Sequence, residues 1–209
     1  MSPTPWDARV ARRLVPPLRA LGVHPNLVTT AGLLTGLGAA ALYAHGGVVA
    51  ANAAAGLFLV TAVLDHADGE LARATGRTSA FGHQYDRVAD LIVKIAIFTG
   101  MGLGVRGGAR PVLLGAAAGV SVVAIFLLRG RIAALRGNQA LRQPSFAGFE
   151  LEDVLYLVVV SLTWLGHVEG FLVCVGIGAP LFALWIGVQY RRASAPEARA
   201  MVVANPRRS

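Results

Sequence analysis

The sequence predicts an all-α integral membrane protein: a six-transmembrane-helix bundle with an N-terminal amphipathic interfacial helix. Of its 209 residues, 55% are hydrophobic and 14% are charged, and the mean hydropathy is +0.60. Such a chain is too apolar for an ordinary soluble domain. Six apolar segments have about the 17–20 residues that a helix needs to cross the hydrocarbon layer. They cover approximately residues 27–45, 47–64, 86–104, 111–128, 151–168 and 169–190.

Basic residues flank these segments on alternate sides. The net charge of +8 would suit a nucleic-acid-binding protein, but this distribution favours a membrane protein, because loops rich in Lys and Arg stay cytoplasmic. We therefore expect the cell membrane, with both termini and the 65–87 and 129–150 loops in the cytoplasm, whereas the opposite loops hold only Arg106 and Arg110. The expected cytoplasmic groups are Arg9, Arg12, Arg13 and Arg19; Arg73, Arg77 and Arg87; Arg129, Arg131, Arg136 and Arg142; and Arg191, Arg192, Arg199, Arg207 and Arg208.

The N-terminal segment mixes apolar and basic residues. Residues 6–21 suit an interfacial helix interrupted by Pro16 and Pro17, and a disordered basic tail is the alternative. We expect no cleavable signal peptide, since Asp7 precedes the first apolar run. The whole chain, 1–209, is expected to be one membrane domain, with the interfacial helix in 1–22, the six-helix bundle in 23–190 and a solvated cytoplasmic tail in 191–209.

Small residues recur at helical spacing in three of the apolar segments. Such pairs let helix backbones approach closely, so they suit either a homodimer interface or tight packing within one bundle. The pairs are Gly32/Gly36, Gly100/Gly104 and Gly115/Gly119. Cys174 is the only cysteine, which excludes an intrachain disulfide.

Four aspartates form two pairs at the ends of neighbouring apolar segments. Asp65 and Asp68 are three residues apart, and Asp86 and Asp90 are four apart, so each pair shares a helix face. Acidic groups in a membrane segment cost about 2.5–3.5 kcal/mol each on insertion scales. Four converging carboxylates also repel one another, and hard divalent cations such as Mg²⁺ or Mn²⁺ would balance them. Such a set could hold two ions about 3.5–4 Å apart, as in phosphoryl transfer.

A purely structural interpretation accounts for part of this pattern. Asp68-Gly69 alone would fit a turn, and acidic residues often cap helices. It does not account for two helical pairs of aspartates with Arg73 five residues after Asp68.

The segment from Asp65 to Asp90 reads D-x2-D-G-x2-A-R-x8-G-x3-D-x3-D. It resembles the signature of the CDP-alcohol phosphotransferases, which include synthases of several phospholipid head groups. The match spans 26 residues, and the expected architecture is also similar to that family. The fixed positions are Asp65, Asp68, Gly69, Ala72, Arg73, Gly82, Asp86 and Asp90.

The resemblance implies a reaction and a set of roles. A phosphatidyl-type group would pass from a CDP-linked lipid donor to an alcohol with release of CMP, in phospholipid biosynthesis. The four aspartates would hold the Mg²⁺ or Mn²⁺ ions, and Asp90 would also be the general base. The residues implied to bind the CDP donor are Gly69, Ala72, Arg73, Thr78, Ser79, Gly82, Asn26 and Thr29, the last two through a resemblance to a Pro-Asn-x2-Thr motif.

The acceptor alcohol is less well indicated. Arg129 and Arg131 resemble a basic motif that family members place there to bind a phosphorylated polyol, such as inositol phosphate or glycerol phosphate; alternatively they are membrane anchors. Glu150, Glu152 and Asp153 depart from the inositol-phosphate pattern. They either cap a helix or contact an amino alcohol or neutral polyol.

Two other functions stay open. A divalent-cation transporter would also need intramembrane carboxylates, but not Gly69, Arg73 and Gly82 at fixed spacing, and a non-catalytic relative would bind the nucleotide lipid without turning it over. Lys94, four residues after Asp90, either compensates charge inside the bundle or meets the acceptor.

Overall fold

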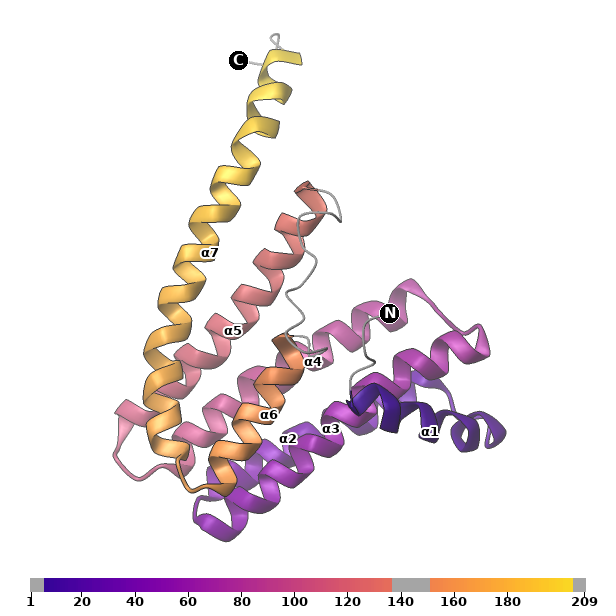
Figure 1. Cartoon of the computed structure of the whole chain (residues 1–209), viewed down its shortest axis with the longest axis vertical. Coiled ribbons are helices and arrows are strands. Elements are labelled where there is room, and N and C mark those ends of the chain that lie inside the picture. Colours follow the sequence, from indigo (N-terminus) through magenta and orange to yellow (C-terminus); the bar gives the residue numbers. More distant parts are fainter. Residues whose placement is uncertain (1–5, 137–150, 205–209) are drawn as a thin grey trace.

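The computed structural model describes residues 6–136 and 151–204. This part of the chain is all-helical, and Figure 1 shows its helices as one assembly. The helices are α1 (Trp6–Ala20), α2 (Pro25–His45), α3 (Val48–Thr75), α4 (Ala80–Gly104), α5 (Ala109–Arg136), α6 (Leu151–Trp164) and α7 (Val168–Ala204).

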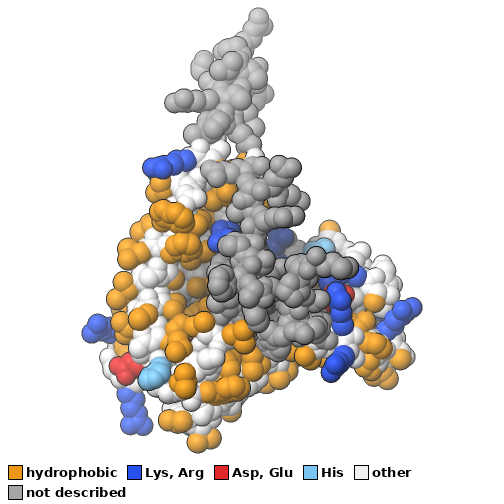
Figure 2. All heavy atoms as spheres, viewed as in Figure 1, with side chains coloured by type: hydrophobic (Ala, Val, Ile, Leu, Met, Phe, Trp, Pro, Cys, Tyr) orange, Lys and Arg blue, Asp and Glu red, His pale blue; other side chains and the backbone are white. Residues whose placement is uncertain are grey.

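The expected all-α class is confirmed, whereas the number of membrane spans is supported only in part. Within residues 6–136 and 151–204, four helices are long and apolar enough to cross a bilayer, namely α2, α3, α5 and α7. The helix α4 carries Arg87, Asp90 and Lys94, and the described α6 has 14 residues. Hydrophobic side chains cover much of the face in Figure 2, and basic side chains lie mainly at its margins, as expected for a surface in contact with lipid.

Three helix boundaries differ from the prediction. The helix α1 continues through Pro16 and Pro17. The expected 65–87 loop is mostly helix, because α3 continues to Thr75 and leaves a linker of residues 76–79. The helix α7 continues to Ala204, so the predicted tail at 191–209 is helical up to that residue, and its solvated, cytoplasmic character stays a prediction. Its sequence there is rich in Ala and Arg, which favour helix.

The helices pack in a connected order. The helix α2 packs on α3 and α4, α1 packs on α3, and α5 lies between α4 and α7 (Figure 1). The helix α6 packs on α3, where the Tyr43 and Thr163 hydroxyls join α2 to α6 by a buried hydrogen bond of 2.9 Å. The apolar core includes Phe58, Ile97 and Phe98.

The predicted glycine pairs bring helices together within the chain. A Cβ on Gly100 or Gly104 would collide with the backbone of Ala40 or Tyr43 in α2. A Cβ on Gly115 would collide with the backbone of Phe98. These positions therefore serve packing within one bundle, and the homodimer stays a prediction.

Candidate active site

The two aspartate pairs meet because a short linker reverses the chain between α3 and α4. Gly76 ends α3 in the left-handed conformation, with φ of 66°, which glycine adopts without steric cost. Ser79 then caps α4: its Oγ accepts a hydrogen bond of 2.9 Å from the amide of Gly82. The pair on α3 is thereby placed beside the pair on α4.

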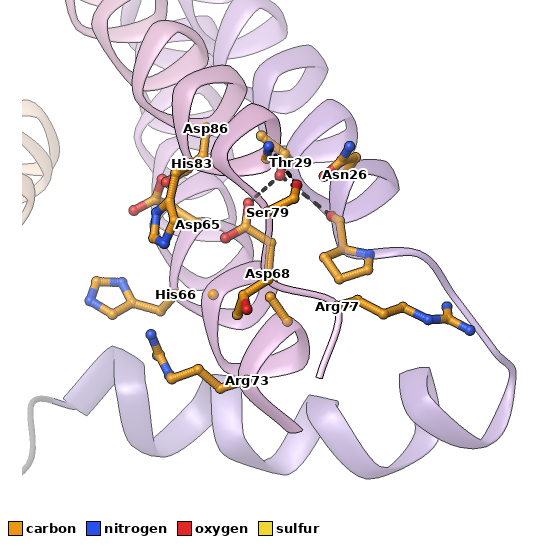
Figure 3. A pocket seen from close by; sticks show the side chains of 15 residues that line it. Asn26, Thr29, Asp65, His66, Asp68, Arg73, Arg77, Ser79, His83 and Asp86 are labelled. Atoms are coloured by element: carbon orange, nitrogen blue, oxygen red, sulfur yellow. Dashed lines mark hydrogen bonds between the residues drawn. The ribbon is translucent and has the colours of Figure 1, made fainter. Parts of the chain in front are cut away.

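A cavity of about 240 Å³ opens between α2, α3, the linker and α4. Figure 3 shows Asp65, Asp68 and Asp86 near one another, with Arg73 and Arg77 extending in opposite directions on either side of Asp68. The lining residues are Pro25, Asn26, Thr29, Asp65, His66, Asp68, Gly69, Ala72, Arg73, Arg77, Thr78, Ser79, Gly82, His83 and Asp86. All eight residues predicted to bind the donor are therefore brought together in one cavity.

A second, much smaller cavity lies against the first. Its volume is about 20 Å³, which is enough for one water molecule or one ion. Asp65, Asp68 and Asp86 line both cavities, and Asp90 lines the smaller one. Tyr156 of α6 also contributes to its wall.

Asp68 and Asp90 each contact a side chain of another type within the bundle. Thr29 of α2 donates a hydrogen bond of 2.5 Å to Oδ2 of Asp68, which is 5% exposed. Asp90 forms an ion pair with Lys94, whose side chain is buried. Hydrogen bonds and ion pairs of this kind reduce the cost of placing charge inside a helix bundle.

The arginines of the larger cavity are connected to the N-terminal region. Glu70 pairs with Arg73 at 3.3 Å and with Arg12 of α1 at 3.6 Å. Arg77 donates a hydrogen bond of 3.4 Å to the carbonyl of Gly22, in the turn after α1. Both guanidinium groups can bind a phosphate, and their contacts place them at the same side of the cavity as α1.

Gly82, in the first turn of α4, has little room for a side chain. A Cβ on Gly82 would lie 3.1 Å from Ser79 Oγ and 3.2 Å from Asn26 Oδ1. The predicted donor residues Asn26 and Ser79 thus both lie close to Gly82, and a larger residue at position 82 would narrow the cavity.

The carboxylates suit a divalent cation in number and chemistry, since Mg²⁺ and Mn²⁺ prefer oxygen ligands. Four of them surround a cavity of ionic size. In the described residues, however, no three side chains of His, Cys, Asp or Glu form a ready-made ligand group. The four carboxylates thus suit the ion in number and in ligand chemistry, although they do not form a ready-made ligand group here. An oxygen atom of Asp68 contacts Thr29, and an oxygen atom of Asp90 contacts Lys94.

Some residues of this region were not predicted from sequence. Arg77 is four residues after Arg73 but lies in the linker beyond the end of α3 at Thr75, so helical spacing could not place it at the cavity. His66 and His83 adjoin predicted positions. Tyr156 lies 66 residues beyond Asp90, and no local pattern connects it to the aspartates.

The predicted acceptor residues lie elsewhere. Arg129 and Arg131 are in the last turns of α5, half-buried and exposed respectively, and line neither of these two cavities. Glu150 falls outside the described residues, as do the side chains of Glu152 and Asp153.

Comparison with known proteins identifies the family of this chain. Residues 22–189 match the family model of the CDP-alcohol phosphatidyltransferases. Over 89 residues the chain is 39% identical to an archaetidylinositol phosphate synthase of Pyrococcus horikoshii. That alignment covers 42% of this chain and 45% of the relative, so it spans less than half of the relative's length. Because the family model covers most of the chain and includes both aspartate pairs, this protein belongs to the CDP-alcohol phosphatidyltransferase family.

Proposed function

We propose that the protein transfers a phosphatidyl-type group from a CDP-linked lipid, such as CDP-diacylglycerol, to an alcohol in phospholipid biosynthesis. The observation that carries this proposal is the shared cavity: the eight expected donor-binding residues line it together with three aspartates. Membership of the family supports the same reaction class. The cell membrane location, six spans, single domain and cytoplasmic site are part of the proposal and rest on the charge pattern.

The aspartates are the proposed metal site. Asp65, Asp68, Asp86 and Asp90 would hold Mg²⁺ or Mn²⁺ from the walls of the small cavity. A bound divalent cation supplies neutralisation of phosphate oxygens and of the leaving group.

The protein's own residues position the reactants. Arg73 and Arg77 bind the donor diphosphate from the α1 side of the cavity. The acceptor oxygen attacks the phosphorus that carries the lipid group, the bond from that phosphorus to the CMP oxygen breaks, and CMP leaves. Asp90 accepts the proton of the attacking hydroxyl. Holding both reactants beside Asp90 provides much of the rate acceleration.

For the acceptor we propose a phosphorylated polyol, with inositol phosphate first. The support is the name of the relative from Pyrococcus horikoshii and the Arg129–Arg131 motif. Because these arginines line neither cavity, glycerol phosphate, an amino alcohol and a neutral polyol are retained as alternatives.

The test is release of CMP by the purified full chain in nanodiscs. The assay contains CDP-diacylglycerol, Mg²⁺ or Mn²⁺, and separately inositol phosphate, glycerol phosphate, serine, inositol, choline or ethanolamine. We expect release with one acceptor, loss of release in Asp86→Asn, and normal release in the matched control Glu169→Gln at the start of α7. Tight CDP binding without release under every condition would favour a different lipid donor or a non-catalytic relative. Divalent-cation flux in proteoliposomes without CDP binding would favour a transporter.

A further inference from the structure

Lys94 is the only lysine of the chain and one of its most deeply buried large side chains, with 2% exposure. It lies in α4, one helical turn beyond Asp90. Its ammonium forms an ion pair with Asp90 Oδ1 and lies 4.8 Å from the centre of the Phe126 ring in α5. Burial of an ammonium is unfavourable without compensation, so these contacts fix its place.

Asp90, with which Lys94 forms its ion pair, lines the small aspartate cavity. Asp65, Asp68, Asp86 and Asp90 all line that cavity, and like charges this near one another repel strongly where water is scarce. One ammonium compensates one of the four carboxylates. Because Lys94 itself is buried behind Asp90, it acts on the reaction through Asp90 and does not contact a substrate.

We propose that Lys94 is a positioning residue that fixes the Asp90 carboxylate at the cavity and, by its charge, weakens the affinity of the four aspartates for a divalent cation. The inference rests on the proposed function and extends it to a residue outside the family signature. Removal of the lysine has two opposite consequences. The net negative charge around the cavity increases by one, and the Asp90 side chain gains rotational freedom.

The first experiment measures Mn²⁺ binding to the full-length protein in detergent, without substrates, by electron paramagnetic resonance. We compare wild type with Lys94→Met, which removes charge and hydrogen bonding, and with Lys94→Gln, which removes charge but keeps an N–H donor. The Mn²⁺ Kd is expected to fall about tenfold in both variants, because the electrostatic gain in a poorly hydrated site exceeds the entropy of one side chain.

The second experiment measures CMP release at saturating Mn²⁺. The kcat of Lys94→Met is expected to fall by about tenfold or more, since small displacements of a reacting group are costly. The loss should be smaller in Lys94→Gln, whose amide still holds Asp90. The KM for the donor should remain within about twofold, because Lys94 does not line the larger cavity.

The matched control is Tyr43→Phe, which removes the buried hydrogen bond to Thr163 away from the aspartates. It should lower thermal stability without changing Mn²⁺ affinity. If Lys94→Met does not fold, Lys94→Gln carries the test. The role of Lys94 would be overturned by a Lys94→Gln variant with wild-type Mn²⁺ affinity. It would also be overturned if the Mn²⁺ Kd and the kcat both stayed at the wild-type values in the variants. A wild-type protein that neither binds Mn²⁺ nor releases CMP would instead overturn the proposed function, and this inference with it.

Discussion

At the scale of single residues, Thr29 is the contact from α2 to the aspartates. Its hydroxyl donates to Asp68 at 2.5 Å and also lies 3.4 Å from the carbonyl oxygen of Pro25 in its own helix. Both Thr29 and Asp68 are buried, so the hydroxyl sets the orientation of a carboxylate that little water can reach. A hydrogen bond to a charged group contributes about 1.5–3 kcal/mol.

We therefore expect Thr29→Val to lower kcat/KM for the donor by about tenfold, since Val keeps the shape and removes the donor to Asp68. The measurement is the initial rate of CMP release over a range of donor concentrations. Thr75→Val is the control, because its hydroxyl donates to the Leu71 carbonyl of its own helix at 2.7 Å. Equal rates for Thr29→Val and wild type would show that this hydrogen bond does not matter for turnover.

A second residue-scale prediction concerns Asp90. Asp90→Asn keeps the side-chain size but cannot accept the proton of the acceptor, so CMP release should fall by about a thousandfold. Binding of CDP, measured by calorimetry, should remain within about threefold, because Asp90 lines the smaller cavity and not the larger one. Full turnover in this variant would remove Asp90 from the role of base.

At the scale of helices, close approach between α2 and α4 depends on the absence of side chains. The Gly100 position faces the backbone of Ala40, and a methyl group there would push the helices apart. This separation would also disturb the aspartate pairs, because α2 carries Thr29 and α4 carries Asp86 and Asp90.

Gly100→Ala should accordingly lose about 1–3 kcal/mol of stability through overpacking, seen as a lower unfolding temperature in detergent. Gly56→Ala in α3 is the matched control, since no atom lies within 4 Å of the added Cβ. That variant should be as stable as wild type or more so, because Ala favours helix over Gly by about 1 kcal/mol. A similar shift in both variants would argue against tight α2–α4 packing.

The helices also show how far sequence patterns reach. Apolar length located α2 and the end of α4 at Gly104 well, because both helices end where their apolar runs end. It missed the extension of α3 to Thr75, since charged residues such as Glu70 end an apolar run without ending a helix. Pro16 and Pro17 were expected to interrupt the N-terminal helix, yet α1 continues through them.

The site also combines features that local spacing predicts with features that depend on packing between helices. The spacing of Asp65 and Asp68, and of Asp86 and Asp90, predicted that each pair shares a helix face, because helical periodicity sets this. The meeting of the two pairs at one cavity also depends on the linker between α3 and α4. The contribution of Tyr156 depends on the packing of α6 against α3, which no local pattern encodes. The same is true of the positions of Arg129 and Arg131 relative to the cavities.

At the scale of the whole molecule, the orientation in the membrane is the main prediction. Single cysteines are introduced at Arg106, between α4 and α5, and at Arg192, near the end of α7, in a Cys174→Ser background. Because basic loops stay inside, a membrane-impermeant maleimide added to intact spheroplasts should label position 106 and not position 192. Inverted vesicles should give the opposite result. Labelling of both positions from one side would contradict the proposed odd number of spans, α5, α6 and α7, between them.

The division of labour among the helices has an evolutionary consequence. The larger cavity is lined by residues from α2, α3, their linker to α4 and α4 itself, and none of its lining residues belongs to the described parts of α5, α6 or α7. Substitutions in α5, α6 and α7 can therefore change which acceptor is bound beside Asp90 without changing the residues that line the larger cavity and bind the CDP donor. A protein built in this way can acquire different products through substitutions in its C-terminal half. Related chains would then differ most outside the signature that runs from Asp65 to Asp90.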